Sequence, residues 1–172
     1  MDVLTFSPII SHAAIYGLIL SGILFTLILG VTRINPEIML KDYPPDIQSK
    51  YGPMSERTKR QRIPVAIVTL LVFVSIVTLS FQSVGIASRG DISFFTAFLH
   101  LFVMFFVFNL LDWLILDWLI VVAIRPSFIV LPGTEGMAGY KDYGFHFRDF
   151  LIGMLIISLA SLLVAGIVAV LF

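Results

Sequence analysis

Long apolar runs alternate with polar segments along the chain, and four of these runs cover residues 8–31, 63–87, 93–124 and 150–172. A helix needs about 20 residues, at about 1.5 Å each, to cross a hydrocarbon core of about 30 Å. Unpaired backbone groups in hydrocarbon cost several kcal/mol each, and no run alternates in polarity as a barrel strand does. The pattern therefore predicts an all-α, polytopic membrane protein with four transmembrane helices.

The polar segments between the runs indicate an orientation. They cover residues 32–62, 88–92 and 125–149, and ten of the eleven Lys and Arg residues lie in the first and the third. Short loops rich in Lys and Arg remain in the cytoplasm. We therefore expect these two loops inside and both termini outside, in a multi-pass protein of the cell membrane. Short connections also favour an antiparallel bundle of successive helices.

Composition agrees with lipid as the main solvent. The 172 residues are 59% hydrophobic and 13% charged, whereas a soluble domain carries about a quarter charged residues. Because the apolar runs take up most of the chain, we expect a single membrane domain over residues 1–172. There are no cysteines, which excludes disulfides, cysteine-ligated zinc and iron–sulfur clusters.

A basic cluster lies directly before Pro64 at the start of the second run. It consists of Arg57, Lys59, Arg60 and Arg62. Basic residues beside a transmembrane helix attract anionic lipid headgroups at about 1 kcal/mol each. The alternative interpretation is that the cluster only fixes the topology.

Three stripes on the predicted helices indicate packing faces. Small residues recur every four positions in the first and last runs, which allows close helix contact. A polar stripe in the second run predicts hydrogen bonds between helices or, alternatively, the wall of a polar pathway. The stripes are Ala13, Gly17 and Ser21; Ser161, Ala165 and Ala169; and Ser75, Thr78, Gln82 and Gly85.

The third run carries two acidic residues, Asp112 and Asp117, near its predicted cytoplasmic end. At 100° per residue they share an arc of about 140° with Asn109 and Trp113. A carboxylate at membrane depth suggests a functional site. The alternative is that the acids lie at headgroup level beside tryptophans of the interfacial belt. The pentapeptide Leu-Asp-Trp-Leu-Ile occurs twice in succession here, which is too short to indicate a duplication.

The third loop contains glycines at positions 133, 136 and 139. Their spacing matches neither a P-loop nor a dinucleotide-binding fingerprint. A hinge or close backbone packing is one interpretation, and a mobile loop that closes over a site is the other. The sequence does not decide whether residues 125–139 re-enter the membrane.

Three histidines add hypotheses about metals and haem. If a helix extends over Asp142, His146 and Asp149, these side chains share a face and could hold a divalent metal or orient a general base. The alternative is a network of ion pairs and helix caps. His12 and His100 have similar predicted depths in two helices, as axial ligation of a b-type haem would require. No cofactor follows from the pattern alone.

The acids, the third loop and His146 converge on the cytoplasmic interface, where we expect a ligand or substrate site. A small oligomeric transporter or channel is the alternative function, and an accessory subunit of a membrane complex is a third. Enzymatic activity stays open, and the expected partners are the bilayer and further copies of the chain, with no nucleic acid. The candidate catalytic residues are Asp112, Asp117 and His146, and the candidate ligand-binding residues are Asn109, Glu135, Lys141 and Arg148.

Overall fold

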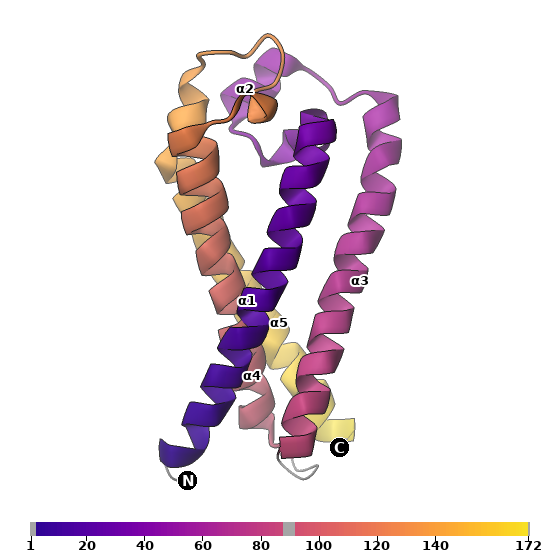
Figure 1. Ribbon diagram of the computed structural model, residues 1–172, viewed down its shortest axis with the longest axis vertical. Helices are drawn as coiled ribbons and strands as arrows, with labels where there is room; N and C mark the ends of the chain where they lie inside the picture. The colour runs from indigo at the N-terminus through magenta and orange to yellow at the C-terminus, as the bar shows by residue number, and fades with distance from the viewer. Residues whose placement is uncertain (1–2, 88–91, 172) are drawn as a thin grey trace.

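The computed structural model describes residues 3–87 and 92–171, and these residues contain helices and no β-strand. Figure 1 shows long helices joined at one end by loops that contain short helices. The long elements are α1 (Val3–Ile34), α3 (Glu56–Ala87), α4 (Phe94–Leu111), its π-helical continuation η2 (Asp112–Ile124), and α5 (Tyr143–Leu171). The short elements are η1 (Pro36–Asp42), α2 (Pro45–Tyr51), η3 (Ser127–Ile129) and η4 (Ala138–Lys141).

Four helices in the described part of the chain are long and apolar enough to cross a membrane: Ser7–Ile34, Glu56–Gly85, Phe94–Ile124 and Tyr143–Val170. This confirms the four predicted apolar helices. The second and the fourth, in α3 and α5, begin at Glu56 and Tyr143, well before the predicted starts at residues 63 and 150. The Ser55 hydroxyl accepts a hydrogen bond from the Thr58 N–H at 3.3 Å, and Asp142 Oδ1 accepts one from the Phe145 N–H at 2.8 Å. Polar caps thus start α3 and α5. Most of the predicted turn over residues 88–92 lies outside the described residues.

The long helices pack in pairs around α1 and α4. Helix α1 contacts both α3 and α4, and α4 contacts α5. Their shared core includes Leu20 and Leu24 of α1 and Leu101 and Met104 of α4. In Figure 1 the start of α1 and the end of α5 lie at the lower end, and α2 lies with the longer loops at the upper end.

The small-residue stripe of α1 lies at its closest contact with α4. Ala13 and Ser21 are buried, and a Cβ at Gly17 would be 2.6 Å from the Met104 carbonyl oxygen. In α5 only part of the predicted stripe is covered, because Ser161 and Ala165 are buried while Ala169 is exposed. The helices therefore approach each other closely at positions occupied by small residues.

The two longer loops fold against each other above the helices. Tyr43 of the first loop donates a hydrogen bond to the Ile129 carbonyl at 2.6 Å, and the Tyr140 hydroxyl accepts one from the Leu131 N–H at 2.9 Å. The rings of Tyr43 and Tyr140 meet edge to face, with centroids 5.9 Å apart. These residues form a second small apolar core, so the loops make a fixed cap over the helix ends.

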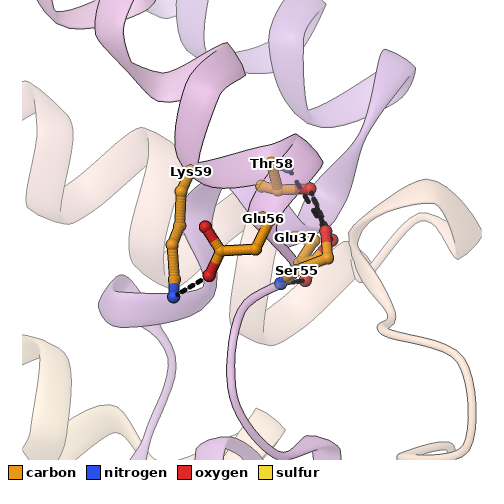
Figure 2. Close-up of polar contacts among 5 residues, drawn as sticks. All are labelled: Glu37, Ser55, Glu56, Thr58 and Lys59. Atoms are coloured by element: carbon orange, nitrogen blue, oxygen red, sulfur yellow. Dashed lines mark hydrogen bonds and ion pairs between the residues drawn. The ribbon is translucent and has the colours of Figure 1, made fainter.

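A buried carboxylate fastens the first loop to the start of α3 (Figure 2). Glu37 accepts hydrogen bonds from the Ser55 N–H, the Ser55 hydroxyl and the Thr58 hydroxyl. Asn35 donates to the Thr58 hydroxyl at 2.9 Å. Burial raises the pKa of Glu37, but the hydrogen bonds from Thr58 and Ser55 outweigh it, and the net pKa is lowered.

Candidate functional site

A cavity of about 350 Å³ lies beneath the loop cap, between α1, η1, η2, η4 and α5. Its polar lining includes four carboxyl groups and one imidazole, and much of the remaining lining is aliphatic. None of its lining residues in the described chain is Lys or Arg. The titratable acids and histidine of the lining are Asp42, Asp112, Asp117, His146 and Asp149.

The π-helix η2 places both of its acids on the cavity. Its hydrogen bonds reach back five residues, as in the bond of 2.8 Å from the Arg125 N–H to the Ile120 carbonyl. In a regular α-helix Asp112 and Asp117 would be about 140° apart. Bonding to the fifth residue reduces the rotation per residue and brings positions five apart onto one face. Trp113 and Trp118 are paired in the same way, with ring centroids 4.5 Å apart.

His146 and Asp117 form the most closely defined polar contact of the cavity. His146 Nδ1 lies 3.2 Å from Asp117 Oδ1, and the histidine is 4% exposed. A carboxylate beside Nδ1 favours the tautomer with its proton on that nitrogen, which leaves a lone pair on Nε2. This Nε2 is buried and has no hydrogen-bond partner in the described structure. Since His146 and Asp117 both line the cavity, the pair could supply acid–base chemistry to a bound group.

Asp42 lies where the cavity meets solvent, since it lines the cavity and is also exposed. Partial desolvation raises the pKa of its carboxyl, and the negative charges of Asp117 and Asp149 add to this shift. The positive charges of Arg62 and Lys41 act in the opposite direction. Sequence reasoning missed Asp42, because it lies in a short 3-10 helix where no periodic pattern marks the inner face.

The structure places the predicted site residues in two groups. Asp112, Asp117 and His146, the candidate catalytic residues, line the cavity together with Asp149. The four candidate ligand-binding residues do not. Asn109 donates to the Phe150 carbonyl at 3.1 Å, Glu135 accepts from the Gly133 N–H at 3.0 Å, Arg148 contacts Asp149 at 3.4 Å, and Lys141 is exposed.

The predicted metal-binding face is only partly assembled. His146 and Asp149 line the cavity, but Asp142 is exposed and its carboxylate caps α5. Within residues 3–87 and 92–171 no group of three or more His, Asp or Glu side chains is placed to hold a metal ion. The metal hypothesis gains no support from these positions.

His12 and His100, the candidate haem ligands, contact each other away from the cavity. Their ring centroids are 5.4 Å apart, and the Tyr16 and Phe81 rings lie at 4.8 Å from His12 and 5.6 Å from His100 respectively. Aromatic packing accounts for both side chains in this arrangement.

Four long apolar helices are compatible with an integral membrane protein, the class that the sequence predicts. No family model matches the chain, and neither a curated protein nor a solved structure is significantly similar to it. The basis for a function is therefore the cavity and its position in the fold.

Proposed function

We propose that the chain is a multi-pass protein of the cell membrane whose cavity binds a ligand or substrate at the cytoplasmic interface. The observation that carries the proposal is the convergence of His146, Asp117 and three further carboxyl groups on one cavity. Its volume lies in the range of small-molecule sites, about 300–1,000 Å³. Polar groups gathered around an otherwise aliphatic cavity orient a ligand, and a carboxylate–imidazole pair supplies acid–base chemistry.

The proposed topology is an antiparallel bundle in one domain, with both termini outside. The basic loops support this orientation, and in Figure 1 they lie at the end opposite to the start of α1. Arg57, Lys59 and Arg60 are exposed beside the start of α3, which supports contact with anionic headgroups of the inner leaflet. The cavity would then open toward the cytoplasm.

Single cysteines test this topology, since the chain has none of its own. In intact cells a membrane-impermeant maleimide is expected to label Ser93→Cys but not Lys50→Cys. Both positions are exposed. Lys50→Cys should react only after the membrane is permeabilised, and Lys141→Cys, in the third loop, should behave in the same way. Labelling of Lys50→Cys in intact cells would reverse the orientation and place the cavity on the outer side.

Native mass spectrometry tests the ligand site itself. Wild-type protein released from its own membranes is expected to retain a small molecule, and His146→Ala and Leu116→Trp are expected to lose it. Leu116 is 5% exposed and lines the cavity, so tryptophan would fill the space. Leu163→Trp is the control, because Leu163 is 67% exposed on α5. Equal retention by Leu116→Trp and wild type, with both folded, would show that the cavity is not the site.

A small oligomeric transporter is the second candidate, and one observation favours it. Ser75, Thr78 and Gln82 form the polar stripe of α3, and all three are exposed in the single chain. Polar side chains that face lipid are unfavourable, whereas a second copy packed on this stripe would supply hydrogen-bond partners. Flux across proteoliposomes distinguishes this function from turnover of a bound substrate.

A further inference from the structure

We infer that the cavity selects a primary amine carried on a hydrocarbon chain, such as an alkylammonium or an amine-bearing lipid. This inference rests on the proposed function, because it names the class of molecule that the proposed site would take. Three features of the lining support it: its charge, its hydrogen-bonding capacity and its apolar walls.

The negative charge of the lining favours a cationic ligand. Four carboxyl groups share the cavity, and no Lys or Arg is found among the described residues around it. Arg62 and Lys41 influence Asp42 from outside the cavity. The negative charges of Asp117 and Asp149 act unfavourably on the Asp42 carboxylate across the cavity, and a positive ligand among these groups would offset that repulsion. An anionic ligand would add to it.

The hydrogen-bonding capacity distinguishes between cations. His146 uses Nδ1 toward Asp117, and its buried Nε2 lacks a donor. The hydroxyl of Tyr43 donates to the Ile129 carbonyl, and that of Tyr140 donates to the Thr134 hydroxyl, whose own proton goes to the Leu131 carbonyl. The cavity therefore offers mainly acceptors, namely the oxygens of its carboxyl groups. A primary ammonium has three N–H donors for these acceptors, whereas a quaternary ammonium has none.

The walls favour a hydrocarbon chain attached to the amine. Ile28 and Leu29 of α1 and Leu116 and Val121 of η2 line the cavity beside the acids. Both elements belong to helices that continue as candidate membrane spans. The head of an amphiphile would thus meet the carboxylates while its chain contacts aliphatic side chains, which gains free energy in proportion to the apolar area buried.

The test compares probes that share one chain and differ in the head. Protein in nanodiscs of zwitterionic lipid is titrated with octylammonium, octyltrimethylammonium, octanol and octanoate, with empty nanodiscs as the control for partitioning. Binding is followed by calorimetry and by the fluorescence of the two tryptophans, both on η2. Octylammonium is expected to bind at least about tenfold more tightly than the other three, the difference that one charge-assisted hydrogen bond makes.

Two variants test which groups of the cavity cause the preference for octylammonium. Asp112→Asn with Asp117→Asn should weaken both cations relative to octanol. His146→Ala should reduce the advantage of octylammonium over octyltrimethylammonium, because it removes the contact that orients Asp117 as an acceptor and leaves the four carboxyl groups in place. Equal binding of octylammonium and octanol, or tighter binding of octyltrimethylammonium, would overturn the inference. If Leu116→Trp still abolishes retention of the native molecule in that case, the ligand class is wrong but the proposed site stands.

Discussion

Gly17→Ala is expected to destabilise the protein by about 3 kcal/mol, although alanine is the better helix former by about 1 kcal/mol. The new Cβ would lie 2.6 Å from the Met104 carbonyl oxygen and 2.9 Å from Val107 Cβ. The nearest of these atoms belongs to the backbone of α4, so no side-chain rotation relieves the contact. Helices α1 and α4 would have to separate along the stripe that joins them, which loses packing that lipid does not replace.

Gly22→Ala is the matched control on the same helix. Apart from its chain neighbours and the backbone of its own helix, no atom lies within 4 Å of a Cβ built at Gly22, so this change is expected to be neutral or slightly stabilising. The apparent midpoint of thermal unfolding in detergent measures both variants, and retention in the membrane fraction shows whether each one inserts. Equal midpoints for Gly17→Ala and Gly22→Ala would mean that α1 and α4 are not in close contact at Gly17.

The sequence predicted the four helices because their cause is local. Each run is long enough to cross the hydrocarbon core, and its length and apolar character can be read from its own residues alone. The small-residue stripe of α1 was visible for the same reason, since Ala13, Gly17 and Ser21 recur at helical spacing. The starts of α3 and α5 were predicted too late because polarity marked the end of the apolar run, whereas Ser55 and Asp142 cap helices that continue beyond it.

The candidate catalytic residues were found in the sequence, but their arrangement was not. A helix with regular geometry separates Asp112 from Asp117, and only bonding to the fifth residue brings them together. The repeated pentapeptide over residues 111–120 has this same period of five residues. The repeat is too short to indicate a duplication, yet its period matches that of the hydrogen bonds in η2. That period is the signal that could have predicted the π-helix.

The loop residues of the site had no comparable signal. Asp42 and Tyr43 reach the cavity because the first loop packs on the third through Tyr140 and Leu131. Such contacts join residues almost a hundred positions apart, and no spacing within either loop reveals them. The charge of Glu135 and the glycines around it predicted a ligand-binding residue instead. Its carboxylate accepts a hydrogen bond from the Gly133 N–H within its own turn. Distant pairing, rather than local pattern, determines which loop residues face the cavity.

Glu37→Ala is expected to cost about 3 kcal/mol of stability and to weaken ligand binding as well. The variant leaves the Ser55 N–H and the buried Thr58 hydroxyl without their acceptor, whereas the Ser55 hydroxyl can still donate to Thr58. An unsatisfied buried donor costs about 1–3 kcal/mol. Glu37 also belongs to η1, the element that carries Asp42 to the cavity. Loosening η1 should therefore change ligand binding even though Glu37 does not line the cavity.

Comparison of wild type with Glu37→Gln measures how the stabilising effect of the Glu37 carboxylate depends on pH. Because the pKa of Glu37 is lowered from 4.5 in the folded protein, its stabilising effect is fully present above that value and is lost as pH falls through the folded pKa. The difference in unfolding midpoint between wild type and Glu37→Gln should be largest near pH 7 and should narrow below about pH 4.5.

Glu56→Gln separates this buried network from ordinary surface charge. Glu56 lies beside the network in Figure 2 and pairs with Lys59 at 2.6 Å, but its side chain is 79% exposed. An exposed pair contributes about 0–1 kcal/mol, since water competes for both charges. Glu56→Gln should therefore change the unfolding midpoint little at any pH. If it destabilised the protein as much as Glu37→Gln, removal of negative charge at the start of α3, rather than loss of the Glu37 hydrogen bonds, would explain both results.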